Sequence, residues 1–237
     1  YWIKCMEKAK SGNFNGTYIY TSRMYQMIPY LNQTVELLRK SRGMLKKKAG
    51  GLLKIGASLG TKFIGLKIDK QLSERTNNIV RNISILLNKI GVNHGYLYEN
   101  DVYSGALLYD LGLDDHLSEY VNRVYRLFKE KEVKKLIVID PHTYQMTAKV
   151  YPEFIDNYDI EVVHYIEILN EKIDLLKDIT GKKNLEVTIH DPCTMARVMG
   201  VTEEPRNILE NLGVQVIEAE NSGLYTRCCG GPIEFAY

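Results

Sequence analysis

The chain has 237 residues, of which 45% are hydrophobic and 25% are charged, and its formal net charge is +2. A chain of this length and composition can bury one large core or two small ones, and its near-neutral charge argues against a nucleic-acid partner. No uninterrupted apolar run reaches the roughly 20 residues needed to span a bilayer, so no transmembrane segment is expected. Four cysteines, three of them near the C-terminus, favour a reducing cytoplasm over secretion.

Apolar residues recur at helical spacing from Ser22 to about Lys40, which predicts an amphipathic helix. Pro29 marks either a kink in this helix or its true start. The short basic run from Arg42 to Lys48 fits a solvated helix end or a contact with a partner. We therefore interpret residues 1–59 as a helical connector that precedes the first compact unit.

From residue 63 onward, short apolar segments alternate with amphipathic ones. Ser73 is the predicted N-cap of the first helix in this region, and Gly91 is its predicted end. The continuous apolar run from Leu136 to Ile139 is typical of a strand covered on both faces. Alternating strands and helices with short connections predict an α/β fold with parallel sheets. Strands are expected at 63–66, 95–98, 136–139, 160–164 and 185–189, and helices at 73–90, 117–129 and 166–176.

Three cysteines stand in a pattern that packing alone rarely requires. His190-Asp191-Pro192-Cys193 is followed, after about thirty-four residues, by Cys228-Cys229-Gly230-Gly231. Adjacent cysteines are poorly placed to bond to each other, because a disulfide needs a specific Cβ geometry. Both can point at one metal centre, and grouped thiolates bind zinc or an iron–sulfur cluster. Inert buried thiols are the alternative, and Cys5, which has no partner at ligand spacing, is interpreted as an ordinary thiol.

Polar residues beside these cysteines have two possible roles. His190 and Asp191 come just before Cys193, where they either hydrogen-bond a cluster sulfur or cap the following turn, as Asp often does. Arg197 and Arg227 flank the cysteines, where they either stabilise a thiolate by their charge or remain solvated surface residues.

The motifs HDPC and CCGG together resemble the CCG-domain repeat, the cysteine-rich module of heterodisulfide reductase B/D-type subunits and of glycolate oxidase iron–sulfur subunits. In that family each repeat reads Cys, then Cys-Cys-Gly, then Cys-x-x-Cys, and the thiolates bind an iron–sulfur centre. The resemblance implies that Cys193, Cys228 and Cys229 ligate a [4Fe-4S] cluster, with zinc as the alternative, and that Gly230 and Gly231 let the backbone approach it closely. The Cys-x-x-Cys would fall beyond the last residue, so we expect the chain to be a fragment.

The sequence also contains what resembles a degenerate first copy of this repeat. Leu86 to Val92 resembles Ile208 to Val214, and Tyr103-Ser104-Gly105 then stands where Cys228-Cys229-Gly230 stands. Further along, Asp140-Pro141-His142-Thr143 stands where the family has Cys-Pro-x-Cys. We interpret Tyr103 and Ser104 as filling the cavity of a lost cluster, with Gly105 kept for its turn.

These comparisons predict two pseudo-repeated, Rossmann-like CCG units with parallel sheets. A first CCG-like repeat without its ligands is expected over 60–180, and the start of a truncated second repeat over 181–237. Leu66 lies near the place expected for the first cysteine of the first repeat. Asp140 and His142 follow a strand and could coordinate a metal, but without a thiolate they make a poor iron–sulfur site.

The resemblance implies an iron–sulfur subunit of a multi-subunit oxidoreductase, similar to the B/D-type subunits of heterodisulfide reductase. Its cluster would take electrons one at a time from a flavin or iron–sulfur partner subunit, and would pass them on or reduce a disulfide. Loss of the first repeat's ligands weakens the disulfide option and leaves electron transfer. A zinc-stabilised structural module and a docking subunit without its own chemistry are the alternatives. We expect a cytoplasmic protein, with peripheral membrane attachment through partner subunits as a further option.

Overall fold

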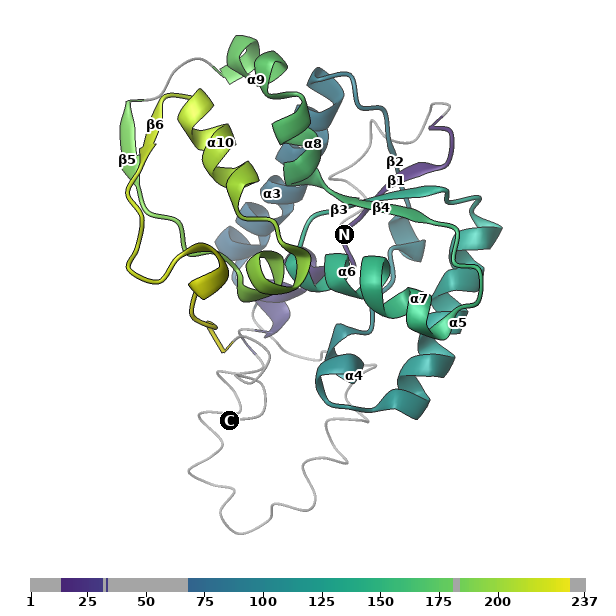
Figure 1. The fold of residues 1–237 in the computed structure, drawn as a ribbon. Coiled ribbons are helices and arrows are strands. Elements are labelled where there is room, and N and C mark those ends of the chain that lie inside the picture. The colour runs from purple at the N-terminus through teal and green to yellow at the C-terminus, as the bar shows by residue number, and fades with distance from the viewer. Residues whose placement is uncertain (1–13, 32, 34–67, 181–183, 231–237) are drawn as a thin grey trace.

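The computed structural model describes residues 14–31, 33, 68–180 and 184–230, without the side chains of 177–180. Parallel strands and helices alternate along this part of the chain (Figure 1), which confirms the predicted α/β class. Four parallel strands form one sheet in the order β2-β1-β3-β4, and two form a second sheet, β5-β6. Their bounds are β1 Thr17–Tyr20, β2 Gly95–Tyr96, β3 Lys135–Val138, β4 Glu161–His164, β5 Leu185–Val187 and β6 Val214–Val216.

Strand β1 was not predicted, although it lies in the middle of the larger sheet. It pairs with β2 on one side and β3 on the other, with Ile19 opposite Ile137. Its four residues, Thr-Tyr-Ile-Tyr, are all β-branched or aromatic and suit a packed strand, and Ile19 and Tyr20 are fully buried. This strand falls inside the segment 1–59 that we interpreted as a helical connector.

Helices cover both sheets. The α-helices are α3 Lys70–Lys89, α4 Ala106–Asp110, α5 Asp114–Glu130, α6 Pro141–Gln145, α7 Tyr151–Phe154, α8 Tyr165–Glu171, α9 Ile173–Thr180 and α10 Glu203–Asn211. Two π-helical turns, η4 Met146–Val150 and η5 Thr194–Met199, and two 3₁₀ turns, η3 Tyr98–Asn100 and η6 Gly223–Tyr225, complete the elements. Residues 24–31 are also helical. The rest of the helix predicted from Ser22 to Lys40 lies outside the described residues, as does the strand predicted at 63–66.

Several predicted boundaries were wrong. Helix α3 begins before Ser73, because the Asp69 carboxylate caps it by accepting hydrogen bonds from the amides of Gln71 and Leu72, at 2.9 and 3.1 Å. It ends as predicted, with Gly91 in the left-handed conformation at φ 77°. The helix predicted at 166–176 is two helices, α8 and α9, and the strand predicted at 95–98 shortens to β2.

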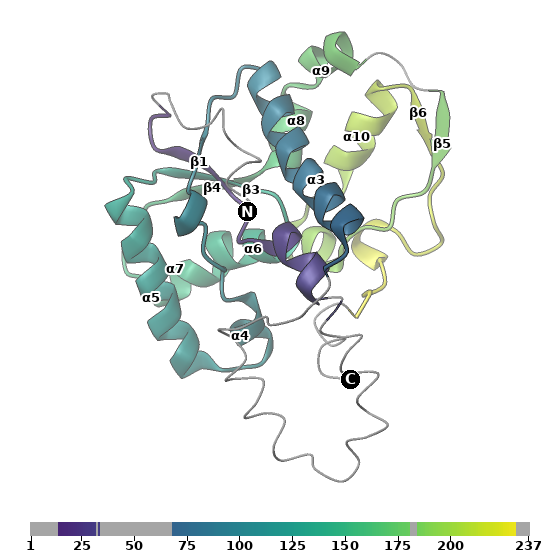
Figure 2. The same cartoon turned by 180° about the vertical axis from the view of Figure 1, so that it is seen from behind.

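Each face of the four-stranded sheet carries its own hydrophobic core (Figures 1 and 2). On the face covered by α3 and α8, the core includes Ile19, Ile137 and Leu87. On the face covered by α5 and α7, it includes Leu136 and Phe128. The central strand β3 is therefore covered on both faces, as its continuous apolar run predicted. No helix in the described ranges is long and apolar enough to cross a membrane.

The two sheets begin in the same way. β1 pairs in parallel with β2, and β5 pairs in parallel with β6. The helix before each second strand ends at a left-handed glycine, Gly91 at φ 77° and Gly213 at φ 76°. By this correspondence the counterpart of the loop after β5, which carries Cys193, is the loop after β1 at Thr21–Arg23. Leu66, which we expected near that place, lies outside the described residues.

Candidate metal centre

Cys193 and Cys228 are brought together from loops that follow different strands. Cys193 precedes the π-helical turn η5 and is partly exposed, whereas Cys228 follows η6 and is exposed. The two thiols lie close enough for each to shift the pKa of the other. Burial, followed by the neighbouring Cys228, raises the pKa of the Cys193 thiol. Of the two thiols, Cys228 is therefore the one that loses its proton more readily.

Three groups favour the ionised form of Cys228. The Gly230 amide donates a hydrogen bond to its sulfur at 3.4 Å. This bond, the Cys193 thiol and the charge of Arg197, in that order, lower the pKa of Cys228. Gly230 adopts the left-handed conformation at φ 75°, and apart from its chain neighbours no atom of the described residues lies within 4 Å of where a Cβ would stand. The glycine thus serves the turn that aims its amide at the sulfur.

The third predicted ligand, Cys229, is exposed beside this pair. In the described part of the chain, no group of three or more His, Cys, Asp or Glu side chains is gathered to hold a metal ion. The thiol pair fits a soft metal or an iron–sulfur centre by its donor chemistry, and it supplies two of the four ligands such a centre needs. His190 and Arg227 are exposed, and Gly231 lies outside the described residues.

Asp191 makes contacts that neither predicted role included. Its carboxylate accepts two hydrogen bonds from Arg206, at 2.8 and 2.9 Å, and one from the Gly223 amide at 2.7 Å. Its side chain is only 3% exposed. The hydrogen bonds from Arg206 hold the pKa of this carboxyl below its usual range. Asp191 is therefore an ionised group that binds α10 and the loop before Cys228.

Arg206 was not predicted as part of the site. From α10 it contacts two carboxylates, because it also donates to Glu218 at 2.6 and 2.9 Å. It further donates to the Thr202 carbonyl at 2.6 Å. In the sequence it is one charged residue of a helix that contains several, so only the fold distinguishes it.

Thr226 joins the two cysteine segments directly. Its hydroxyl donates to the Asp191 carbonyl at 2.8 Å, and its own carbonyl accepts from Arg197 at 2.7 Å. Thr226 is 2% exposed, although its neighbours Arg227 and Cys228 are exposed. The backbone two residues before Cys193 is thus fixed to the backbone two residues before Cys228.

Comparison with known proteins agrees with this geometry. Residues 187–236 match the CCG family of cysteine-rich domains. The resemblance inferred from HDPC and CCGG is therefore confirmed, and the thiol pair lies within the matched CCG domain. No solved structure matches the chain at a significant level.

Three curated relatives are similar over a longer stretch. The EtfAB:quinone oxidoreductase of Syntrophomonas wolfei is 38% identical over 146 residues, which are 61% of this chain and 20% of the relative. The probable iron-sulfur-binding oxidoreductase FadF of Bacillus subtilis is 33% identical, over 66% of this chain and 22% of the relative. The D-type subunit of the dihydromethanophenazine:CoB--CoM heterodisulfide reductase of Methanosarcina mazei is 31% identical, over 61% and 37%. The chain thus spans well under half the length of these oxidoreductases.

Outside the matched CCG region, the loop after β2 has Tyr103 and Ser104 before a glycine, where the loop after β6 has Cys228 and Cys229. Gly105 is left-handed at φ 88°, as Gly230 is at φ 75°. The Tyr103 hydroxyl accepts a hydrogen bond from the Leu107 amide at 2.9 Å, and its carbonyl accepts one from Tyr120 at 2.7 Å. Ser104 is fully buried, and no partner for its hydroxyl occurs among the described residues.

Asp140 also takes a structural role. Its carboxylate caps α6 by accepting a hydrogen bond from the Thr143 amide at 2.9 Å, and burial raises its pKa. Asp140 and His142 belong to no cluster of metal-binding side chains in the ranges that the structure describes. These contacts favour packing and capping over the metal site that we considered there.

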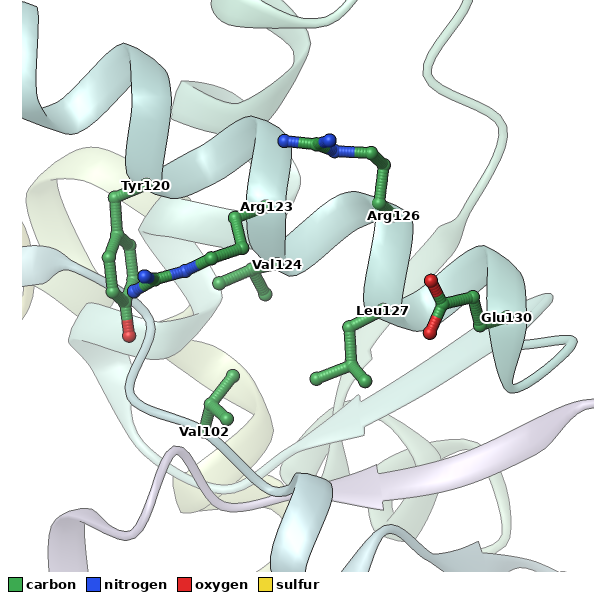
Figure 3. A pocket seen from close by; sticks show the side chains of 7 residues that line it. All are labelled: Val102, Tyr120, Arg123, Val124, Arg126, Leu127 and Glu130. Atoms are coloured by element: carbon green, nitrogen blue, oxygen red, sulfur yellow. The ribbon is translucent and has the colours of Figure 1, made fainter.

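A surface cavity of about 490 Å³ lies beside α5 (Figure 3). The Arg123 guanidinium stands over the Tyr120 ring, 4.9 Å from its centroid. No cysteine lines this cavity, so it is separate from the thiol pair of the CCG domain. Its lining residues are Val102, Tyr120, Arg123, Val124, Arg126, Leu127 and Glu130.

Proposed function

We propose that this protein is an iron–sulfur subunit of an oxidoreductase complex and that Cys193, Cys228 and Cys229 ligate a [4Fe-4S] cluster. The observation that carries the proposal is that hydrogen bonds from Gly223 and Thr226 to Asp191 bring together the segments of Cys193 and Cys228, which lie far apart in the sequence. The similarity of the chain to three oxidoreductases or oxidoreductase subunits supports a redox role. When bound, such a cluster supplies a group that gains and loses single electrons.

The chain's own residues prepare the thiols for ligation. Cys228 is held toward its thiolate form, which is the form that binds metal. Cys193 must lose its proton on ligation, so metal binding releases a proton and depends on pH. The Gly230 amide and the Arg197 guanidinium both favour negative charge at this place. Because Cys228 and Cys229 are exposed, further ligands and a redox partner can approach the site.

The partner would be another redox subunit that carries flavin or iron–sulfur groups. The first repeat presents Tyr103, Ser104 and Asp140 where thiolates would stand, so we assign one centre to this chain and favour electron transfer over disulfide reduction. We place the complex in the cytoplasm, with any membrane attachment made through partner subunits. The alternative, zinc on the same thiolates, would give a structural module without redox chemistry.

Metal analysis of the anaerobically purified protein tests this proposal. We expect about four irons with matching acid-labile sulfide per chain, together with an electron paramagnetic resonance signal that changes on reduction. Cys193→Ser and Cys229→Ser should each lose the iron, whereas the control Cys5→Ser should keep it. Stoichiometric zinc without sulfide, or full iron content in Cys193→Ser, would contradict the assignment.

A further inference from the structure

The loop that carries Cys228 is attached to the loop that carries Cys193 through one aspartate. The Asp191 carboxylate accepts a hydrogen bond from the Gly223 amide at 2.7 Å, and its backbone carbonyl accepts one from the Thr226 hydroxyl at 2.8 Å. Both donors lie in the segment that leads to Cys228, and Asp191 lies two residues before Cys193. The position of Asp191 therefore affects both thiols.

Arg206 fixes Asp191 in turn. Its Nη1 and Nη2 atoms each donate to a different oxygen of Asp191, and its Nε and Nη2 atoms donate to the two oxygens of Glu218. A planar guanidinium with five donors can serve two carboxylates at once, which the single ammonium of lysine cannot do in the same geometry. Glu218 lies between β6 and Cys228, so Arg206 bridges the two loops that carry the cysteines.

The burial of these charges makes the bridge rigid. The side chains of Asp191 and Arg206 are 3% and 11% exposed, whereas that of Glu218 is 46% exposed. A buried charge is stable only when it is paired and hydrogen-bonded, so Asp191 and Arg206 hold each other in one arrangement. The exposed Glu218 orients the guanidinium but contributes little to the free energy of folding.

We propose that Arg206 is a positioning residue for the thiol pair: by bridging Asp191 and Glu218 it sets how closely the Cys228 sulfur approaches the Cys193 sulfur. The inference rests on the proposed function in one respect: that function makes the two thiols ligands of a cluster. The approach of the thiols is a property of the chain itself and is measurable without metal.

Disulfide formation between the two thiols measures this approach. In the full chain carrying Cys5→Ser and Cys229→Ser, the remaining cysteines are Cys193 and Cys228. Diamide oxidises these two thiols to a disulfide and is reduced to the corresponding hydrazine, which takes up both protons. An intramolecular reaction slows when its groups are misplaced, so we expect Arg206→Met to slow it about tenfold or more, and Arg206→Lys to slow it less.

Two further variants separate positioning from loss of stability. The double variant Asp191→Asn/Arg206→Met removes both buried charges, so its fold is disturbed less than that of Arg206→Met alone. The double variant still lacks the bridge, so we expect it to oxidise slowly. Lys129→Met breaks the exposed 2.5 Å ion pair between Lys129 on α5 and Asp159, and this variant should oxidise at the parent rate. Circular dichroism identifies which variants are folded.

Oxidation at the parent rate in a folded Arg206→Met or in the double variant would overturn the proposal. Slow oxidation in both, with the parent rate in Lys129→Met, supports it. This readout is independent of the cluster, so a parent protein that lacks iron would refute the proposed function while leaving the positioning of the thiols testable by the same assay.

Discussion

The backbone amide of Ser104 donates a hydrogen bond to the Ser22 hydroxyl at 2.7 Å, which joins the loop after β1 to the loop after β2. In the CCG domain, the hydrogen bond from the Thr226 hydroxyl to the Asp191 carbonyl, 2.8 Å long, joins the loops after β5 and β6. In each sheet, a hydrogen bond therefore joins the loops that follow the first two strands in the sequence.

The buried Ser104 hydroxyl predicts an unusual response to substitution. Because no described residue satisfies this hydroxyl, Ser104→Ala removes a desolvated polar group and loses no hydrogen bond of the side chain. We expect the free energy of unfolding in urea to stay unchanged or to rise by up to about 1 kcal/mol. As a contrast, Thr147→Val loses the 2.7 Å hydrogen bond to the Thr143 carbonyl and should cost about 1 kcal/mol. A clear loss of unfolding free energy in Ser104→Ala would mean that the Ser104 hydroxyl has a hydrogen-bond partner.

Asp101 predicts a pH dependence of stability. Burial raises the pKa of its carboxyl to about 6, although hydrogen bonds from Thr21, Tyr96 and Ser22 partly oppose the shift. Its pKa in the unfolded chain is near 3.8. The stability gained from the protonated form is therefore complete below pH 4 and is lost as the pH rises through about 6, a change of about 3 kcal/mol.

Asp101→Asn isolates this contribution from those of other groups. The unfolding free energy of the parent minus that of the variant should fall between pH 4 and pH 7, when both are measured in urea. Paired carboxylates such as Asp191, whose pKa is lowered by Arg206, have the opposite dependence and cancel in this difference. A difference that is constant with pH would show that Asp101 is not perturbed.

Gly105 should tolerate substitution poorly. It has φ 88°, and a Cβ would stand 3.1 Å from Cδ1 of Tyr120. Gly105→Ala should therefore lose about 1–2 kcal/mol from the left-handed backbone and more from displacing the tyrosine ring. Gly112→Ala is the matched control, because Gly112 has φ 65° and open space around its Cβ position. Equal losses of stability in Gly105→Ala and Gly112→Ala, measured by thermal or urea unfolding, would mean that the Tyr120 ring moves aside without a cost in free energy.

Tyr103 tests whether the first repeat takes part in metal binding. Tyr103→Ala removes a half-buried ring and the acceptor of the Leu107 amide, so we expect a loss of about 1–3 kcal/mol of stability. Its iron content per folded chain should equal that of the parent, whereas Cys228→Ser should lose iron. Reduced iron in folded Tyr103→Ala would indicate that this loop contacts the centre.

The parts of the fold that were predictable carry their signal within a few neighbouring residues. The apolar run of β3 identified a strand covered on both faces, and the spacing of Leu117, Val121, Val124 and Phe128 identified α5. The turn at Gly105 was visible in the sequence, because this glycine follows Tyr103-Ser104 as Gly230 follows Cys228-Cys229. The cysteine motif predicted the matched CCG family by type and spacing.

The parts that were missed depend on contacts between distant segments. Strand β1 is only four residues long and gains its stability from β2 and β3, which follow much later in the chain. Arg206 acts through Asp191 and Glu218, and no local pattern distinguishes it from the other charges of α10. The sequence predicts Ser73 as the N-cap because serine is a favoured residue at that position. Asp69 is also a good N-cap residue, and it caps α3 one turn earlier.

The different spacing of the two strand pairs has a consequence for how the chain folds. Tyr18 in β1 pairs with Gly95 in β2, whereas Leu185 in β5 pairs with Val214 in β6, which is much nearer in the sequence. Closing the longer loop costs about 1 kcal/mol more in chain entropy, and distant pairings form late. We therefore expect β5 and β6 to associate early, so that the two thiols already face each other while the larger sheet is still incomplete. A cluster supplied to the full-length chain during refolding would then meet two of its ligands before the larger sheet is complete.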